Sequence, residues 1–279
     1  MLMSYKKRKI VQVGVYQQHS HVQFVWLDNL KQVQFLSFLM SETNIKAQLI
    51  ARVMQDFPQN HLQLYLVGCV SPHLTWSKNL ILPHALNAQE CEQQCRFILQ
   101  EELPIPLEEL WFDYLTTDLK QGFRLDIYAI RRQIACETQR ISDELLLNVL
   151  DVAYHSMMRA FRFLLGDVQK NSLYLYQDES HCFALTDTAH SQQFLQTSEN
   201  LTALYSKFCQ RFNVEIEYVY VYVYRTTNVE QTDLPENWRQ VKTDIPFIAL
   251  GNALWRIDWV QNNSLVSTAS SSGAGDERD

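Results

Sequence analysis

Alternating apolar and polar positions divide the start of the chain into strands and one helix. Three runs are rich in β-branched and aromatic residues and predict short antiparallel strands. They span residues 10–15, 22–27 and 33–38. An apolar residue at every fourth position of 45–57 then predicts a helix with Asn44 at its N-cap. A buried strand at 62–70 follows. The order is therefore three strands, a helix and a strand.

A separable unit of the β-α-β-β type is predicted between about residues 71 and 131. Its elements are a strand at 74–82, a helix at 88–101, and strands at 110–116 and 123–130. Asn87 supplies a favourable N-cap, and Cys91 and Cys95 share one face of the helix. Pro104 ends this helix, because proline lacks an amide hydrogen and restricts the residue before it.

The segment that follows this unit supports two interpretations. A short helix is predicted at 131–140. Local propensity then favours a long helix that begins at 145–150 and reaches Leu165, because leucine favours helices and Ser142 or Asp143 supplies an N-cap. A short apolar run of this kind is also compatible with a buried strand. The residue pattern alone leaves both structures open.

The second half of the chain repeats the order of elements found in the first. Short strands are predicted at 172–176, 181–186 and 191–196, and a helix at 198–212. Valines and tyrosines then alternate within 214–224, which is typical of a strand. We expect a central or half-exposed strand whose tyrosines face a groove. A platform for stacking nucleobases is disfavoured, because Glu215 and Glu217 precede the tyrosines.

The end of the chain adds one helix and a polar tail. Residues 246–256 predict a helix that contains Gly251. Residues 262–279 are rich in serine, glycine and aspartate, and we expect them to be disordered because they have little to bury. Four tryptophans suit either a core or a peptide-binding groove. They are Trp111, Trp238, Trp255 and Trp259.

The repeated order of elements predicts an α/β protein with the two ribonuclease H-like lobes of the actin-like fold. We expect the first lobe to span residues 1–165, with the β-α-β-β unit as an insert at about 71–131. The second, smaller lobe is expected to span 166–261, with its last helix packed back on the first lobe. Residues 262–279 form the tail beyond both lobes.

Composition is typical of a soluble globular protein. The 279 residues are 47% hydrophobic and 20% charged, with a formal net charge of -7. An acidic balance disfavours generic binding to nucleic acid, because no broad basic surface is present to displace counterions from phosphates. No apolar run approaches the roughly 20 residues that cross a bilayer. We therefore expect a cytoplasmic protein.

Metal and nucleophile chemistry find little support in the sequence. The six cysteines, Cys69, Cys91, Cys95, Cys136, Cys182 and Cys209, lack the spacing of a zinc site, and we expect reduced thiols. His19 and His21 share a turn, but two ligands do not complete a zinc site. No GxSxG motif is present for a serine nucleophile. We assign no metal ligand and no catalytic residue.

Three passages resemble the PilM family of pilus-assembly proteins, which is related to ComA and HofM. They are LPIPLEELWFDY within 98–114, VLDVAYHSMMRAF at 149–161 and IALGNAL at 248–254. The resemblance implies an actin-like fold with the insert on the first lobe, and it favours a strand at 145–150. It also implies a place at the cytoplasmic face of the inner membrane, through binding of the N-terminal cytoplasmic segment of a PilN-like membrane protein.

The chain departs from the family where actin-like ATPases hold phosphates. Such turns need a carboxylate for Mg²⁺ and small residues that let the backbone approach the phosphates. The first turn falls at Gly14, Tyr16 and Gln17, and has no carboxylate or lysine. The second falls at Asp178, where the following glycine is missing; a role in a hairpin turn is favoured over one as a metal ligand. Gly251 matches a late glycine near the adenine side, and tight packing explains a single helix glycine equally well. We interpret all five positions as degenerate and assign no cofactor.

These observations favour a scaffold without enzymatic activity. We expect a protein of a type IV pilus or DNA-uptake (competence) machine that captures an extended partner segment between its first lobe and its insert. The alternative is an actin-like protein in the same machine that binds ATP and hydrolyses it weakly. A small-molecule or nucleic-acid binding module is the least favoured class, because of the acidic balance.

Overall fold

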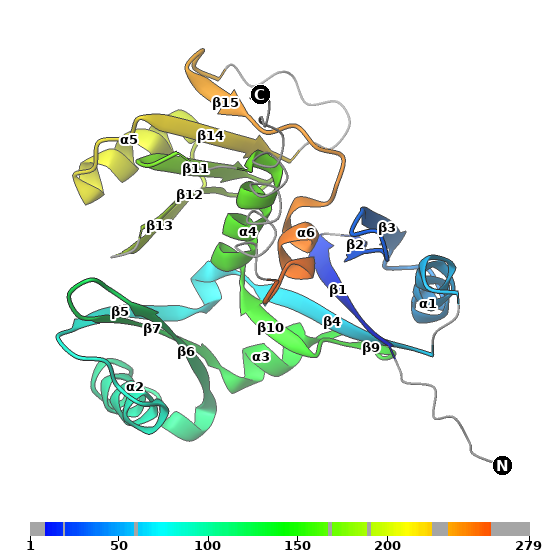
Figure 1. Cartoon of the computed structure of the whole chain (residues 1–279), viewed down its shortest axis with the longest axis horizontal. Helices are drawn as coiled ribbons and strands as arrows, with labels where there is room; N and C mark the ends of the chain where they lie inside the picture. The colour runs from blue at the N-terminus through cyan, green and yellow to red at the C-terminus, as the bar shows by residue number, and fades with distance from the viewer. Residues whose placement is uncertain are drawn as a thin grey trace, which may run out of the picture.

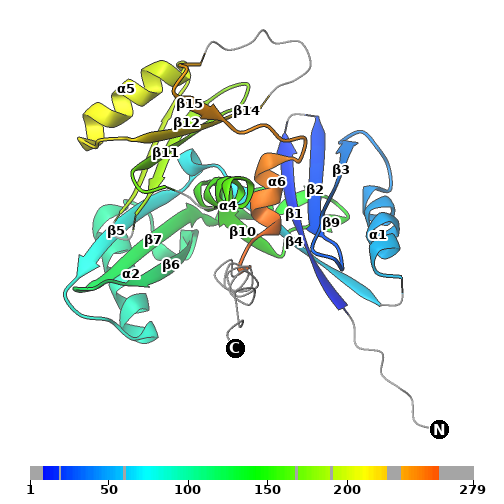
Figure 2. The same cartoon turned by 45° about the horizontal axis from the view of Figure 1, so that its top comes forward.

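The computed structural model describes residues 9–18, 20–58, 61–166, 169–188, 191–224 and 234–257. Within these ranges the chain forms two five-stranded sheets, a three-stranded sheet and a two-stranded ribbon. Figure 1 shows the first sheet on the right, the other large sheet at the upper left and the three-stranded sheet at the lower left. The helices α4 and α6 lie between the two large sheets (Figures 1 and 2).

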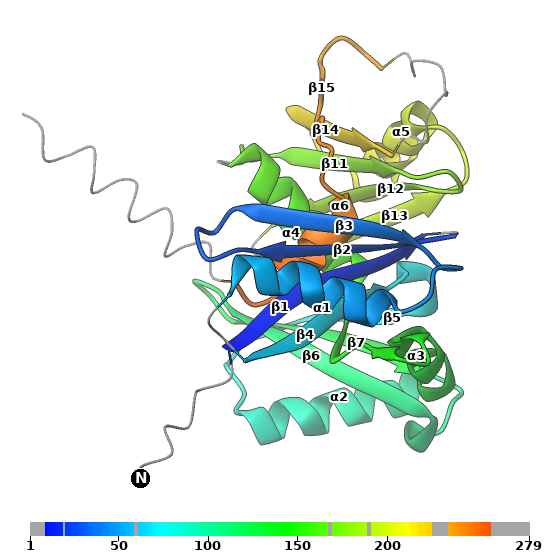
Figure 3. The ribbon, with the colours of Figure 1, turned by 90° about the vertical axis from the view of Figure 1, so that its right-hand side faces the viewer.

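The first large sheet has the strand order β10-β4-β1-β2-β3. Its elements are β1 (Lys9–Gln18), β2 (His21–Leu27), β3 (Val33–Leu39), α1 (Ile45–Asp56), β4 (Leu62–Val70) and β10 (Val149–Val152). Strands β1, β2 and β3 are antiparallel, and β4 lies parallel to both β1 and β10. Ile45, Leu49 and Val53 of α1 are buried against this sheet, whose outer face α1 covers (Figure 3).

The second large sheet repeats this topology in the order β13-β12-β11-β14-β15. Its elements are β11 (Ser172–Gln177), β12 (Cys182–Asp187), β13 (Gln192–Thr197), α5 (Leu201–Phe212), β14 (Tyr218–Val223) and β15 (Trp238–Gln240). Three antiparallel strands are again followed by a helix and by strands parallel to the first. The repeated ribonuclease H-like order confirms the predicted actin-like fold.

The insert packs one helix on a three-stranded sheet. It contains η1 (Pro72–Leu74), β5 (Trp76–Leu82), α2 (Ala88–Glu102), η2 (Leu107–Glu109), β6 (Leu110–Asp118) and β7 (Phe123–Arg131). The side chain of Asn87 accepts a hydrogen bond from the amide of Glu90, whose carboxylate accepts one from the amide of Asn87, so the expected cap is a full capping box. Cys91, Cys95 and Leu99 form the buried face of α2.

The helical interpretation of residues 145–150 is wrong. After α3 (Arg132–Gln139), the chain forms β8 (Arg140–Ser142), β9 (Leu145–Leu146) and β10, and α4 (Ala153–Leu165) begins only afterwards. Leu145 and Leu147 are buried in the core beneath α1, and β10 pairs with β4. Tertiary pairing and burial here outweigh the helix propensity of leucine. The strand favoured by the family resemblance is present.

Two smaller expectations are also corrected. Asn44 occupies the N-cap of α1 with a φ of 59°, but its side chain makes no capping hydrogen bond. Asparagine suits this position because it tolerates the left-handed region better than most residues. The strand expected at 214–224 is shorter, since β14 begins at Tyr218, and β15 has no clear signal in the sequence.

The tyrosines of β14 do not line a groove as expected. Tyr220 and Tyr222 are buried, and each ring stacks on a tyrosine of the neighbouring β11. Phe247 of α6 (Phe247–Ala253) stacks on Tyr222, with ring centroids 4.1 Å apart. The opposite face of β11, with Leu173 and Leu175, packs on α5. The tyrosine strand therefore supplies the core between the second sheet and the central helices.

Two glycines allow α6 to approach its neighbours closely. A Cβ atom on Gly14 of β1 would lie 2.0 Å from the carbonyl oxygen of Ala249, and one on Gly251 would lie 1.8 Å from that of Ser156. Both distances are far inside van der Waals contact, and both involve backbone atoms. Helix α6 is therefore packed directly on the backbones of β1 and of α4.

Several sequence expectations stay predictions. The division into lobes at 1–165 and 166–261, with an insert at 71–131, is one of them, although α6 does contact β1 and β2. The disorder expected for 262–279 lies outside the described residues, as do Trp259 and His19. Among the residues that the structure describes, no helix is long and apolar enough to cross a membrane.

Replacing Gly251 by alanine tests the packing of α6. We expect Gly251→Ala to lower the free energy of unfolding by about 2 kcal/mol, because overpacking against backbone outweighs the better helix propensity of alanine. Urea unfolding followed by circular dichroism measures the change. Ser206→Ala, at an exposed position of α5, is the control and should stay within about 0.5 kcal/mol of the parent. Equal stability of the Gly251 variant would contradict the close approach.

Candidate functional site

Three of the five predicted phosphate-turn residues meet at one small cavity. Tyr16, Gln17 and Asp178 line a space of about 240 Å³ between the two large sheets. Gly14 and Gly251 do not line it, and each instead packs against a backbone. Tight packing was one of the two explanations weighed for Gly251, whereas the packing role of Gly14 was not foreseen.

This cleft fits a nucleotide poorly. The carboxylate of Asp178 accepts hydrogen bonds from the amides of Ser180 and His181, both at 2.8 Å, so it closes its own turn. Burial raises the pKa of Tyr16 well above its usual value and that of Cys69 to about 12, so both groups are neutral. No lysine or arginine is among the described residues that line the cleft. A triphosphate with Mg²⁺ needs such charges. That the turns are degenerate stays a prediction.

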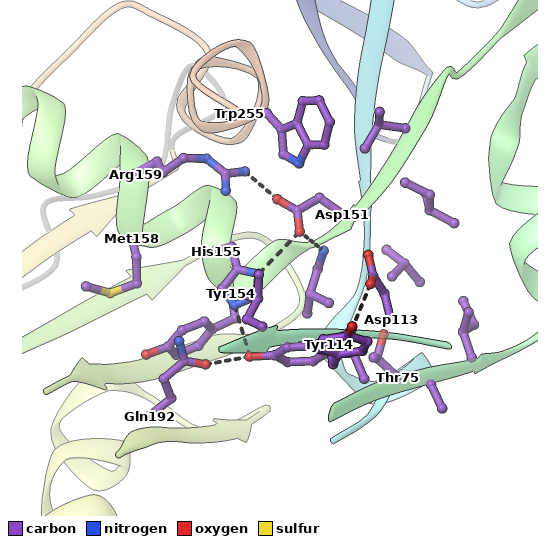
Figure 4. Close-up of a pocket in the computed structure, with 18 of the residues that line it drawn as sticks. Thr75, Asp113, Tyr114, Asp151, Tyr154, His155, Met158, Arg159, Gln192 and Trp255 are labelled. Carbon is purple, nitrogen blue, oxygen red and sulfur yellow. Dashed lines mark hydrogen bonds and ion pairs between the residues drawn. The ribbon is translucent and has the colours of Figure 1, made fainter. Parts of the chain in front are cut away.

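A larger groove lies where the insert, the first sheet and α4 meet, with a volume of about 600 Å³. One wall is strand β6 with its neighbour β7, the opposite wall is β10, and α4 supplies the floor. Figure 4 shows the side chains of these elements converging on the groove. Among the described residues, β6 and β10 are each the last strand of their sheet, so each presents an edge that no described strand pairs with.

A chain of polar contacts crosses the floor of the groove (Figure 4). Asp151 of β10 accepts a hydrogen bond from Arg159 at 2.6 Å and lies 3.2 Å from Nδ1 of His155. The other ring nitrogen of His155 is 3.0 Å from the hydroxyl of Tyr128 on β7. This hydroxyl donates to Oε1 of Gln192 on β13 at 2.6 Å. The contacts therefore link the first sheet, α4, the insert and the second sheet.

Arg159 also ties the groove to the centre of the molecule. Its Nε donates to the carbonyl oxygen of Gly251 at 2.7 Å, while its terminal nitrogen holds Asp151. Burial alone would raise the pKa of Asp151, but the hydrogen bond from His155 and the charge of Arg159 outweigh it and hold that pKa at about 2. Asp151 is therefore a stable anion that anchors α4 to β10.

Further contacts join the insert and α4 to the second sheet. Arg124 of β7 donates to the carbonyl oxygen of Thr188 at 2.7 Å. Arg162 of α4 pairs with Asp187 at 2.5 Å, and the hydroxyl of Tyr154 donates to the carbonyl oxygen of Thr186 at 2.6 Å. The groove is therefore framed by parts of the chain that hold one another in place.

Little of this polar chain is predictable from the sequence. Trp111 was assigned to a core or a groove and does line the groove, together with Trp255. Asp151, His155 and Arg159 were quoted only as part of a family passage. The spacing of four residues between His155 and Arg159 was an available signal, since such residues share one face of a helix. Gln192 and Tyr128 carried no local signal.

A metal site finds no support in the structure. Among the described residues, no group of three or more histidine, cysteine, aspartate or glutamate side chains is placed to hold an ion. The six cysteines are free, and Cys91 and Cys95 are buried beneath α2 rather than exposed to ligands. His19 and His190 lie outside the described residues.

Comparisons with known proteins concern the fold. No protein-family model matches the chain, and no curated protein is significantly similar to it. Among solved structures, the PilM–PilN type IV pilus biogenesis complex is 14% identical with a TM-score of 0.49, and the match covers 73% of this chain and 66%, slightly under two thirds, of that chain.

Two further structures are similar at comparable or lower levels. The cytoplasmic domain of EpsL, an inner membrane component of the type II secretion system of Vibrio cholerae, is 13% identical with a TM-score of 0.49, covering 86% of this chain and 92% of that one. A protein with an actin-like ATPase fold from Bacteroides thetaiotaomicron is 8% identical with a TM-score of 0.42, covering 81% and 86%. The fold assignment itself rests on the strand order described above.

Asp151→Asn tests the anchor on the floor of the groove. At pH 7 we expect a loss of about 3 kcal/mol in the free energy of unfolding, because Arg159 keeps a buried charge without its anion. The contribution of Asp151 is complete above its ordinary pKa of 3.8 and is lost as pH falls toward its folded pKa of about 2. The deficit should therefore shrink by about 1 kcal/mol at pH 3.

Denaturant unfolding of both proteins across pH measures this difference. Between pH 7 and pH 5 the deficit should be constant, which serves as the internal control. A deficit that does not shrink between pH 5 and pH 3 would show that Asp151 is not held as an anion by Arg159 and His155.

Proposed function

We propose that this protein is a non-catalytic scaffold of a type IV pilus or DNA-uptake machine. It binds the cytoplasmic N-terminal segment of a PilN-like inner-membrane protein in the groove between β6 and β10. The observation that carries the proposal is the groove itself, whose walls are two strand edges left unpaired by the described part of the chain and whose floor is polar. The resemblance of three sequence passages to the PilM family supports the identity of the partner.

The walls of the groove suit an extended peptide. Trp111 and Leu115 of β6 are 38% and 47% exposed, although both are large apolar side chains. Covering them would remove apolar surface from water, which is the main source of affinity in peptide recognition. Strand edges add backbone hydrogen bonds that do not depend on the sequence of the peptide. Recognition of this kind needs no reacting group.

Binding to such a partner would place the protein at the cytoplasmic face of the inner membrane. In this proposal the association is peripheral and passes through the partner, so the protein itself need not enter the bilayer. The cavity lined by Tyr16, Gln17 and Asp178 favours a scaffold over the ATPase alternative. The carboxylate of Asp178 is hydrogen-bonded to amides of its own turn, and burial keeps the hydroxyl of Tyr16 neutral.

Leu115→Ala tests the groove as the binding surface. We expect this variant to bind a synthetic peptide of the PilN-like N-terminal segment roughly tenfold more weakly. Alanine buries less apolar side-chain surface against the peptide than leucine does. Isothermal titration calorimetry or fluorescence anisotropy measures the affinity. Leu30→Ala is the matched control, since Leu30 is 77% exposed but does not line the groove, and its affinity should equal that of the parent. No binding of the peptide to the parent protein would sink the proposal.

Titration with ATP and Mg²⁺ separates the scaffold from the ATPase. We expect no binding at micromolar concentrations, because the cleft offers neither a free carboxylate turn nor a lysine or arginine among its described residues. Calorimetry on the same preparation that binds the peptide provides the positive control for folded protein. Micromolar affinity for the nucleotide would favour the ATPase alternative instead.

A further inference from the structure

Strand β6 has a cavity on each of its two faces. Residues 111–114 line the groove described above and also line a second cavity of about 630 Å³ on the side of α2. Leu115 belongs to the groove alone, whereas Glu92, Arg96 and Glu108 belong to the second cavity alone. The edge of β6 therefore runs between two hollows rather than along one.

We propose that the partner segment adds to the insert sheet as a fourth strand along the free edge of β6, and that it presents a cation to Asp113. This inference rests on the proposed function and specifies how the segment binds. A strand directs successive side chains to opposite faces. A segment paired with β6 would thus place alternate side chains in the groove and in the second cavity.

The backbone of β6 is prepared for such pairing. The sheet has the order β5-β7-β6, so β6 pairs on one side with β7 and presents its other edge. The amide of Tyr114 donates to the carboxylate of Asp113 at 2.8 Å. Because this amide bonds to a side chain and not to β7, it faces the free edge. An incoming carbonyl group would replace Asp113 at this position.

The other wall of the groove, β10, cannot pair with an added strand in the same way. On β10 the amide of Val152 donates to Asp151 at 2.7 Å, which is the same local arrangement. Asp151, however, is also held by Arg159 and lies beside His155, and it is largely buried. Asp113 is exposed, and its one hydrogen bond within the described part of the chain is the one to Tyr114. The carboxylate of Asp113 can therefore release the amide of Tyr114, whereas that of Asp151 cannot release the amide of Val152.

The charges around Asp113, which lines both cavities, favour a cation on the segment. Arg96 is paired with Glu92 at 2.8 Å and lies over the ring of Phe112. The remaining charged side chains of the second cavity are Glu108, Asp113 and Arg132, with a net charge of -1. Once Asp113 releases the amide of Tyr114, its carboxylate is bonded to no other group that the structure describes. A lysine or arginine of the segment supplies the opposite charge there.

The groove face of the segment carries the cation between apolar side chains. Trp111, Asp113 and Leu115 occupy alternate positions of β6, so all three side chains project to the same face of the sheet. Ile130 of β7, Val149 and Leu150 of β10 and Met158 of α4 complete this face of the groove. On its groove face the segment is therefore expected to carry a cation flanked by apolar side chains.

Single N-methylation of the peptide backbone tests strand addition without changing the protein. The probe is a synthetic peptide of the PilN-like N-terminal segment, methylated at one amide at a time. We expect methylation of every second amide along the central stretch to weaken binding by at least roughly tenfold, because these amides pair with β6. The amides between them point away and should tolerate the methyl group. Calorimetry measures each affinity.

The outcomes separate the two proposals. Tight binding of the unmodified peptide without this alternation overturns strand addition and leaves the proposed function standing. Failure of the unmodified peptide to bind overturns the proposed function itself. Alternation combined with protection of the Tyr114 amide from hydrogen exchange in the complex supports strand addition on β6.

A double-mutant comparison tests the cation. Asp113→Asn is combined with a peptide in which the lysine or arginine nearest this position is replaced by methionine. We expect each change alone to weaken binding about fivefold, and the second change to add little once the first is made. Asp118→Asn, at an exposed position of the same strand outside both cavities, is the matched control and should leave the affinity unchanged. Strictly additive effects would overturn the charge assignment.

Discussion

The close approach of α6 to two backbones is the constraint on which the rest of the structure depends. Gly14 lets α6 lie on β1, and Gly251 lets it lie on α4, at distances that any side chain would prevent. Gln12 donates to the carbonyl oxygens of Ala253 and Trp255 at the end of this helix. Asn252 donates to the carbonyl oxygen of Val15 at 2.8 Å. These polar contacts are buried or half-buried, so breaking them would leave groups without partners.

The groove inherits its geometry from this central packing. Arg159 contacts the carbonyl oxygen of Gly251 with one nitrogen and Asp151 with another, so the position of α6 fixes α4 relative to β10. His155 lies one turn earlier on α4 and reaches Tyr128 of the insert. A displacement of α6 would therefore change the distance between the two strand edges that form the walls. Packing at the centre and recognition at the surface are physically coupled.

The sequence predicted helices and strands whose signals lie within a few residues. It did not predict contacts between residues that are far apart in the chain. Periodicity gave α1, α2, α5 and most strands, and Asn87 gave the start of α2, because these signals lie within a few residues. The segment 145–150 was undecided, since the pairing of β10 with β4 depends on residues about eighty positions away. The contact between Tyr128 and Gln192 spans 64 positions and leaves no pattern in either segment. The floor of the groove could thus not be assembled from sequence.

The fate of the predicted phosphate turns shows why a residue type alone is weak support for chemistry. Gly14 and Gly251 have sufficient explanations in packing, and Asp178 has one in its own turn. The ring of Tyr16 packs against the core between the sheets, where a phosphate would need a polar lining. None of these residues therefore counts in favour of a nucleotide. The first explanation of a glycine in such a fold is therefore the close approach of two backbones.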